Sequence, residues 1–296
     1  LRDELRLRYQ PIVDTKSGLI TGAESLLRWE HASYGMVQPK ILIPLAEQSG
    51  LINEIGQWSI EQACQERRRW LNHGHHGEIG ISVNISVHQL MAPDFARSMA
   101  KVLNDTNTEP RAMTLEVTES VLVADEERAL SVIKGLKHLG LMVALDDFGT
   151  GQSSLSHLKQ FPVDMVKIDQ SFIADVQNNA ASWLIVNAVV DLAHGLGMTV
   201  VAEGVETFQQ HDQVLALDCD LSQGFYFSQP RSTEDLGAIL ANHDMLPEPS
   251  RFLGRSAPNP PNPPDRPGRT HARHPETVLS GFDASSGLQR WRRKHV

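Results

Sequence analysis

Cysteine is scarce in this sequence, with Cys64 and Cys219 the two among 296 residues. Two thiols so far apart do not make the disulfide framework of a small secreted domain, so we expect a reducing compartment and a cytoplasmic location. Long apolar runs are also missing, since no stretch approaches the roughly 20 residues of a membrane span. The chain has no signal-peptide pattern at its start. Because it begins at Leu1 rather than Met, we interpret it as a piece of a longer protein, compatible with a preceding sensor or a membrane anchor.

Positive charge is scarce outside the C-terminal segment. The formal net charge is −9. Residues 246–296 carry nine Lys and Arg against four Asp and Glu, a balance of +5, so residues 1–245 carry −14. Such an acidic body lacks the basic surface that a phosphate backbone needs, which argues against duplex nucleic acid as a partner. It is compatible with metal ions, because hard cations bind carboxylates.

The composition changes sharply near residue 246. Residues 247–275 contain nine prolines and several arginines, a composition that does not build a core. We therefore expect a folded domain over 1–245 and a tail over 246–296 that is disordered or extended. The final residues, LQRWRRKHV, allow two interpretations: a solvated or non-native tail, which we favour, and a segment that binds an anionic surface.

Residues 1–245 alternate strand-like apolar runs with amphipathic helical stretches. The predicted strands are RLRYQPIVD, LITGAESLL, IGISVNIS, AMTLEVTE, MVALDDFG, DMVKID and MTVVAEGVE. The predicted helices cover 41–49, 53–72, 87–104, 124–139, 153–160, 180–196, 207–216 and 232–242. Alternating units of this kind predict parallel strands joined by crossover helices. Seven or eight such units predict an α/β fold, a (β/α)8 barrel of the TIM type.

Polar residues, mostly carboxylates, stand at or near the ends of the predicted strands. They are Glu24, Asn84, Glu116, Asp146, Asp147, Lys167, Glu203 and Gln223. In a barrel enzyme the carboxyl ends of the strands converge on the face that carries the chemistry. Packed carboxylates repel and raise one another's pKa, so divalent cations are needed to neutralise the cluster. Oxygen ligands of this type suit Mg²⁺ or Mn²⁺.

The segment VALDDFGTGQSS places two adjacent carboxylates, Asp146 and Asp147, where an apolar strand ends. Neighbouring residues of a strand point to opposite faces, so the pair could contact two metal positions. Paired metals are a common device for phosphoester hydrolysis. The glycines that follow, Gly149 and Gly151, allow a tight turn close to a phosphate. A lone DDFG is more often a simple turn, and the interpretation rests on the whole set of strand ends.

With these residues in view, the chain resembles the EAL domain family of cyclic-di-GMP phosphodiesterases. The resemblance covers about residues 1–240 and follows the family's motifs in order. They read YQPIVD, GAESLLRW, IPLAEQSGLI, VNIS, LEVTES, DDFGTG, FPVDMVKIDQSF, VVAEGVE and QGFYF. The resemblance implies a modified (β/α)8 barrel whose first strand is antiparallel to the rest. It also implies hydrolysis of one phosphodiester bond of cyclic-di-GMP, giving linear pGpG.

The resemblance implies a role for each matching residue. Glu24, Asn84, Glu116 and Asp146 match ligands of a first metal, Asp147 a ligand of the second, and Glu203 a further member of the metal shell. Lys167 would hold and polarise the attacking water, and Glu24, Lys167 and Glu203 are thus the expected catalytic residues. For the substrate, Arg28 would contact a phosphate, Gln10 a guanine, and Gln223 would order the site. Glu119 would position the loop used in substrate binding and dimerisation.

The resemblance also implies a homodimer, and a sensor or GGDEF-type domain before this chain. Three positions depart from the family pattern: Ser25 where the family has Ala, Gln152 where Tyr is usual, and Phe225 in place of a Tyr. None removes an expected metal ligand. Two alternatives to an active cyclic-di-GMP phosphodiesterase remain. One is a catalytically weak or inactive cyclic-di-GMP receptor, and the other is a different metal-dependent barrel hydrolase.

Overall fold

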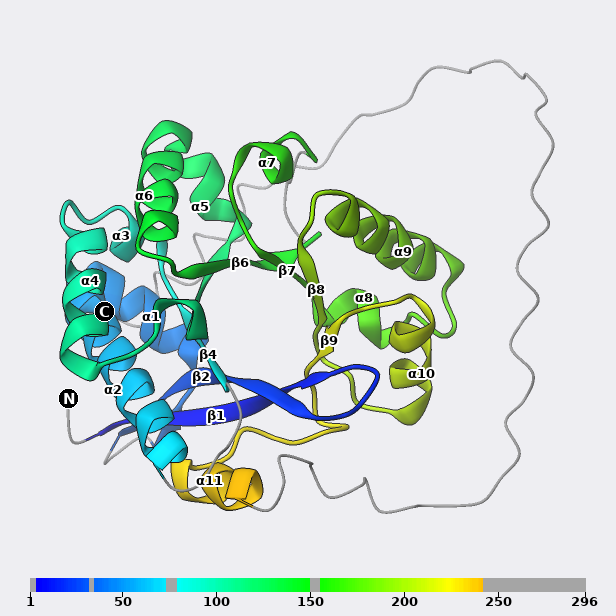
Figure 1. The fold of residues 1–296 in the computed structure, drawn as a ribbon, viewed down its shortest axis with the longest axis horizontal. Coiled ribbons are helices and arrows are strands. Elements are labelled where there is room, and N and C mark those ends of the chain that lie inside the picture. The colour runs from blue at the N-terminus through cyan, green and yellow to red at the C-terminus, as the bar shows by residue number, and fades with distance from the viewer. Residues whose placement is uncertain (1–3, 32–34, 73–78, 150–154, 242–296) are drawn as a thin grey trace, which may run out of the picture. The chain divides into compact units, whose positions relative to one another are not determined.

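The computed structural model describes residues 4–31, 35–72, 79–149 and 155–241. Within these residues the strands form one sheet in the order β1-β9-β8-β7-β6-β5-β4-β2-β3, and β1 also pairs with β2, which closes a barrel (Figure 1). The bounds are β1 Leu5–Asp14, β2 Ile20–His31, β3 Gly35–Val37, β4 Gly80–Asn84, β5 Met113–Thr118, β6 Met142–Phe148, β7 Met165–Ile168, β8 Thr199–Ala202 and β9 Leu221–Ser222. The short β3 extends β2 outside the closed ring. The predicted tail over 246–296 and Gln152 lie outside the described residues.

The direction of β1 sets it apart from the rest of the barrel. It runs antiparallel to both β2 and β9, whereas successive strands from β2 round to β9 pair in parallel. The TIM-type barrel with an antiparallel first strand is thereby confirmed. The physical reason is the short link over 15–19, since a parallel crossover needs a dozen or more residues. Asp14 holds this turn by accepting the N–H of Ser17 at 2.7 Å.

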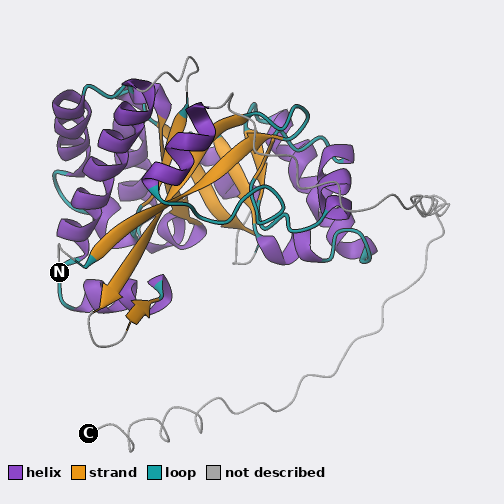
Figure 2. Cartoon of the chain, turned by 90° about the horizontal axis from the view of Figure 1, so that it is seen from below, coloured by secondary structure: helices purple, strands orange, loops and turns teal. Residues whose placement is uncertain are grey.

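Helices surround the barrel on its outside (Figures 1 and 2). Their bounds are α1 Pro39–Gln48, α2 Ile52–Asn72, α3 Val87–Leu90, α4 Phe95–Thr106, η1 Pro110–Ala112, α5 Glu119–Ala124, α6 Glu126–His138, α7 Leu155–Gln160, α8 Gln170–Ala174, α9 Ala180–Gly195, α10 Phe208–Ala216 and α11 Thr233–Ala241. Strand β6 shows how the two layers meet. Val143 and Leu145 belong to the main hydrophobic core together with Ile133 of α6. The alternate residues of β6, among them Ala144 and Asp146, face the barrel interior, as strand periodicity requires.

Two predicted helices are wrong in their extent. The helix predicted over 87–104 is interrupted between α3 and α4, because Pro93 has no N–H to donate and disfavours helical backbone at Ala92. The helix predicted over 124–139 begins only at Glu126. Asp125 precedes it with φ −157° and accepts the N–H of Arg128 as a helix cap. The short elements β3, α5, α8 and β9 were not predicted, since a few residues carry too little periodic pattern.

At the amino-terminal ends of the parallel strands, the same arrangement of an aspartate, a backbone N–H and a basic side chain occurs twice. Asp164, directly before β7, accepts the N–H of Val143 in β6 at 2.8 Å and pairs with Lys137 of α6 at 2.6 Å. Asp220, directly before β9, accepts the N–H of Val200 in β8 at 2.8 Å and contacts His194 of α9 at 2.9 Å. Each aspartate thus joins a helix end, a strand start and the next strand.

Candidate active site

Lys167 is the centre of the polar cluster at the carboxyl ends of the strands. Its side chain comes from β7, is 1% exposed and points into the barrel. The Nζ atom lies 2.8 Å from Glu116 Oε2 and 2.7 Å from Glu203 Oε1. It lies 3.0 Å from Asp146 Oδ1 and 3.5 Å from Glu24 Oε2. Four strand-end carboxylates therefore share one buried ammonium.

Side-chain amides hold the Glu24 carboxylate from its other sides. Asn84 Nδ2 donates to Glu24 Oε1 at 2.6 Å, and Gln223 Nε2 donates to Glu24 Oε2 at 2.7 Å. Gln223 Nε2 also lies 3.2 Å from Gln10 Oε1, and Gln10 donates to the carbonyl of Ser228 at 3.1 Å. Because β1 and β2 pair Gln10 directly with Glu24, the antiparallel first strand builds one wall of the site.

The backbone at Asp147 explains how two adjacent carboxylates face one site. Asp147 has φ +53°, and the pairing of β6 with β7 shifts register between Leu145 and Phe148. This left-handed conformation is one that Asp tolerates better than most residues. It breaks the strand alternation, so Asp147 turns toward the same side as Asp146. Carboxylate oxygens of Asp146, Asp147 and Glu203 lie within 4.8 Å of one another.

Glu119 and Gly149 fix the loop that follows β6. The N–H of Gly149 donates to Glu119 Oε1 at 2.9 Å. Gly149 has φ +99°, and a Cβ atom there would lie 2.7 Å from the ring of Phe172. Both the conformation and the space therefore require glycine. Glu119 stands outside the carboxylate cluster and binds the backbone that leaves it.

Burial and mutual repulsion shift the pKa values of the cluster. Burial, reinforced by repulsion from Glu24, raises the pKa of Glu116 well above its ordinary value. Burial raises the pKa of Glu203 to about 8, against the lowering effect of Lys167. Burial and the neighbouring Asp146 likewise raise the pKa of Asp147.

Two groups of the cluster keep their charge despite burial. Burial alone would lower the pKa of Lys167, but the surrounding carboxylates, Glu116 first, raise it well above its ordinary value. Burial alone would raise the pKa of Glu24, but Lys167 and the amides of Gln223 and Asn84 hold it below its ordinary value. Within the cluster, the surroundings thus favour the ammonium form of Lys167 and the carboxylate form of Glu24.

The residues present fit divalent cations. Lys167 supplies one positive charge, against five carboxylates when all are ionised: Glu24, Glu116, Asp146, Asp147 and Glu203. Among the described residues, Asp146 Oδ1 has no hydrogen-bond donor and only the ion pair with Lys167, and Gln223 Oε1 is buried without a partner. Surplus negative charge and free oxygen atoms are what a hard cation needs.

A cavity of about 320 Å³ opens above the cluster. Its lining includes Gln10, Glu24, Asp146, Asp147, Glu203, Gln223 and Phe225. The ring of Phe225 stands at the edge and is 56% exposed. Arg28 is not among the lining residues. It lies four residues beyond Glu24 on β2, and its Nη1 donates to the neighbouring carbonyl of Leu27 at 2.9 Å.

Two carboxylates outside the predicted set also line this cavity, Asp169 and Glu206. Asp169 follows Lys167 by two positions, so strand alternation alone could have indicated it. It also caps α8 by accepting the N–H of Ser171 at 2.9 Å. Glu206 follows Glu203 in an irregular segment, where no periodicity points to it.

Two sequence expectations about the environment can be set beside the structure. Cys64 and Cys219 are both buried and form no disulfide. Among the helices of the described residues, none combines the length and the apolar character that a membrane crossing requires.

Comparison with known sequences finds one family. Residues 1–230 match the sequence model described as "EAL domain". The chain is 40% identical over 240 residues to the Pseudomonas aeruginosa "Bifunctional diguanylate cyclase/cyclic di-GMP phosphodiesterase MucR", covering 81% of this chain and 35% of MucR. The chain thus spans about a third of the length of that curated relative.

Comparison with solved structures agrees. The structure titled "PaMucR Phosphodiesterase, c-di-GMP complex" superposes with a TM-score of 0.76 at 40% identity, over 79% of this chain and 95% of that one. The EAL enzyme Bd1971, in a form bound to cAMP and cyclic-di-GMP, superposes with a TM-score of 0.77 at 31% identity, over 81% of this chain and 65% of that one.

Proposed function

The chain belongs to the EAL domain family, and from this premise we propose that it hydrolyses cyclic-di-GMP to linear pGpG with the help of Mg²⁺ or Mn²⁺. The observation that supports this most is the cluster itself. Four carboxylates, three on different strands and Glu203 directly after β8, lie within 3.5 Å of one buried ammonium. A charge arrangement of this kind is costly for folding and useful for phosphoryl chemistry.

Six residues are proposed as the metal-binding set. Glu24, Asn84, Glu116 and Asp146 would hold one ion, and Asp147 with Glu203 would hold or share the second. Metal ions bound there supply an acidified water and neutralise charge on the phosphate. The carboxylates' part is to keep their oxygen atoms directed at one small volume, which the barrel does by bringing the carboxyl ends of several strands together.

Lys167 is proposed to act as a cation throughout the reaction. Because the surrounding carboxylates raise its pKa well above the ordinary value, it stays protonated and donates hydrogen bonds rather than accepting a proton. In that state it holds the attacking water and favours its deprotonated form. The water loses one proton as its oxygen bonds to phosphorus, the bond from phosphorus to the ribose 3′ oxygen breaks, and that oxygen takes up one proton, so that one water molecule is consumed in all.

The outer residues are proposed to bind the nucleotide. Arg28 would exchange its bond to the Leu27 carbonyl for a phosphate oxygen, for which its planar fork is suited. The exposed ring of Phe225 offers a flat surface on which a base can stack. Gln10, whose amide already contacts Gln223 and Ser228, would approach a guanine from the inner wall. Glu119 would keep the loop after β6 in place through Gly149.

We also propose the wider setting. Relatives such as MucR are much longer than this chain, which supports a sensor or GGDEF-type domain elsewhere in the same polypeptide. The two buried unpaired cysteines are compatible with a cytoplasmic location. A homodimer is expected for the folded domain over 1–245, and light scattering on the purified chain would measure it.

The experiment is a direct assay. The purified chain is incubated with cyclic-di-GMP and either Mg²⁺ or Mn²⁺, and the nucleotide is followed by chromatography. Glu24→Gln removes one charge at the cluster, and Glu127→Gln makes the same change at an exposed position of α6. We expect pGpG from the wild type and from Glu127→Gln, and none from Glu24→Gln. Tight binding of cyclic-di-GMP without product would instead indicate a receptor.

A further inference from the structure

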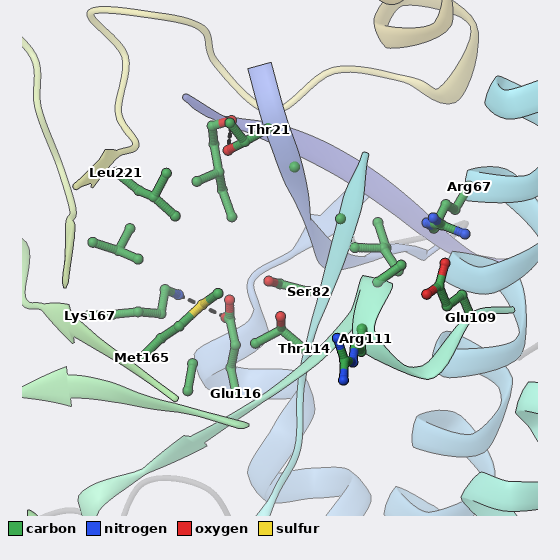
Figure 3. A pocket seen from close by; sticks show the side chains of 17 residues that line it. Thr21, Arg67, Ser82, Glu109, Arg111, Thr114, Glu116, Met165, Lys167 and Leu221 are labelled. Atoms are coloured by element: carbon green, nitrogen blue, oxygen red, sulfur yellow. Dashed lines mark hydrogen bonds and ion pairs between the residues drawn. The ribbon is translucent and has the colours of Figure 1, made fainter. Parts of the chain in front are cut away.

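The barrel contains a second cavity at the end opposite the candidate active site (Figure 3). Its volume is about 360 Å³. It shares no lining residue with the cavity above the cluster. Its inner end is formed by Glu116 and Lys167, so it reaches the underside of the candidate active site from the amino-terminal face of the parallel strands.

Small residues on one side of the barrel create this space. Gly22 of β2, Gly80 and Ser82 of β4 and Ala144 of β6 line the cavity. At comparable interior positions, barrels of this type are filled by layers of bulky branched side chains. Unfilled volume removes packing contacts and lowers the stability of a fold. An occupant would restore those contacts.

The wall formed by β4 and β5 carries two hydroxyls that face the cavity. Ser82 and Thr114 are register partners on these strands and are 6% and 7% exposed. Neither hydroxyl bonds to another described residue, and Figure 3 shows both directed into the cavity. Glu116 follows Thr114 by two positions and continues this polar wall inward. Each hydroxyl is therefore left to bond whatever fills the cavity, either water or a ligand with a polar edge.

The opposite wall is apolar. It consists of Ile12, Met165, Val201 and Leu221, from β1, β7, β8 and β9. Water against such a wall gives up hydrogen bonds that it would make in bulk solvent. Displacing it with an apolar surface is therefore favourable, provided that the polar wall keeps its hydrogen bonds.

The charges around the cavity favour a neutral occupant. At its inner end, Lys167 is paired with Glu116 at 2.8 Å. Away from that inner end, Arg67, Arg111 and Glu109 also line the cavity (Figure 3). Both signs are present in both places, so an ion would meet repulsion wherever it met attraction.

We propose that this cavity is a binding site for a small neutral molecule with one hydrogen-bonding edge and one apolar face. The edge bonds the hydroxyls of Ser82 and Thr114, and the apolar face covers Met165 and Leu221. Such an occupant touches Glu116 and Lys167 from below. Any effect of that contact on hydrolysis rests on the proposed function, but binding itself does not.

The test uses the chain with ¹³C-labelled methionine methyl groups and resorcinol as the probe. Resorcinol has two hydroxyls on one edge of an apolar ring. The Met165 signal is identified by its loss in Met165→Leu. We expect a saturable shift of this signal, with a roughly millimolar dissociation constant typical of a fragment. Thr114→Val, which keeps the side-chain volume and removes the hydroxyl, is expected to weaken binding about fivefold to tenfold.

Three results would overturn the proposal. The first is a Met165 signal that does not shift, or shifts without saturation, which would mean that only water fills the cavity. The second is binding by benzoate as tight as by resorcinol, which contradicts a neutral ligand. The third is unchanged resorcinol binding in Ala144→Leu, whose larger side chain fills the cavity. If that variant does not fold, Leu221→Trp, which places a larger side chain in the apolar wall, replaces it. None of these measurements needs metal or cyclic-di-GMP, so failure of the proposed hydrolysis leaves them interpretable.

Discussion

The two ends of this barrel use aspartate and glutamate in opposite ways. At the amino-terminal end, Asp164 and Asp220 each have a base and a backbone N–H as partners. At the carboxyl end, four carboxylates contact Lys167, Asp147 lies beside two of them, and the pKa values of Glu116 and Glu203 are raised. One end is satisfied within the protein, and the other is left with surplus charge.

The difference separates what folds the chain from what the chain is proposed to do. A carboxylate with its own base and a backbone donor stabilises the fold. A carboxylate that competes for a shared ammonium contributes little stability or lowers it. The repeated clamp of Asp164 and Asp220 can thus support a strained cluster at the other end of the same strands.

The largest expected effect comes from Asp146→Asn, because it changes one charge in the cluster and almost nothing in shape. We expect the rate of cyclic-di-GMP hydrolysis to fall by about 10³-fold or more, since a proposed metal ligand is weakened. The free energy of unfolding without metal is expected to stay equal or to rise, because repulsion within the cluster decreases. Kinetic assay and urea denaturation of the same preparation measure both quantities. A large decrease in the free energy of unfolding would show that Asp146 stabilises the fold, which contradicts the proposed difference between the two ends of the barrel.

The pH dependence of the metal-free protein should be dominated by the carboxyl end. A carboxyl whose pKa rises to about 8 on folding, as for Glu203, stabilises the fold below its ordinary pKa of 4.5. That contribution is lost as pH rises through about 8. Glu116 and Asp147 shift in the same direction. We expect stability to fall by on the order of a few kcal/mol between pH 5.5 and 9, and Glu203→Gln to flatten the curve. A flat curve for the wild type would show that the cluster is less crowded than the structure indicates.

Metal binding should offset the repulsion between the carboxylates at the carboxyl end and thereby stabilise the fold. A ligand that binds only the folded state at 100 times its dissociation constant adds about 2.7 kcal/mol of stability. We therefore expect Mn²⁺ to raise the melting temperature of the wild type. EDTA should lower it again to the value of the metal-free protein. The same shift is expected in Asp164→Asn and a much smaller one in Asp146→Asn. Equal shifts in both variants would place the stabilising metal elsewhere.

Asp164→Asn makes the same substitution at the opposite end. The amide can still accept the N–H of Val143, but the ion pair with Lys137 is lost. Because this pair is about three-quarters buried, we expect a loss of about 1–3 kcal/mol in the free energy of unfolding. The rate of hydrolysis per folded molecule should change by less than twofold. Denaturation and assay side by side with Asp146→Asn give the matched comparison.

The barrel and the carboxylate cluster at one end of it could both be predicted from the sequence. The alternation of strands and helices predicts the barrel, and the carboxylates at successive strand ends predict the cluster, because parallel strands bring their carboxyl ends to one face. The antiparallel first strand came from the family resemblance. The short link over 15–19 was a physical signal for it, since so few residues join only an antiparallel pair.

Other features depend on geometry that no local pattern carries. The positive φ of Asp147 reverses the alternation that a strand predicts, so the convergence of Asp146 and Asp147 has to be seen. The break before α4 was marked by Pro93. The second cavity depends on small residues from several strands facing one another across the barrel, a relation between distant segments that periodicity within one segment does not contain.

The smallest expected effect concerns Ser25, one of the three positions at which the sequence is expected to depart from the family pattern. Its hydroxyl donates to the carbonyl of Ser82 at 2.9 Å, and the side chain is 3% exposed. Ser25→Ala should therefore lower the free energy of unfolding by about 1 kcal/mol or less, because one net hydrogen bond is lost while apolar contact is kept. Although Ser25 directly follows Glu24, strand alternation turns it to the other face, so the hydrolysis rate should stay within about twofold. A tenfold change in rate at unchanged stability would show that catalytic influence crosses the sheet. The rate of hydrolysis would then depend on residues of both faces of β2, and the difference between the two ends of the barrel would not be enough to explain it.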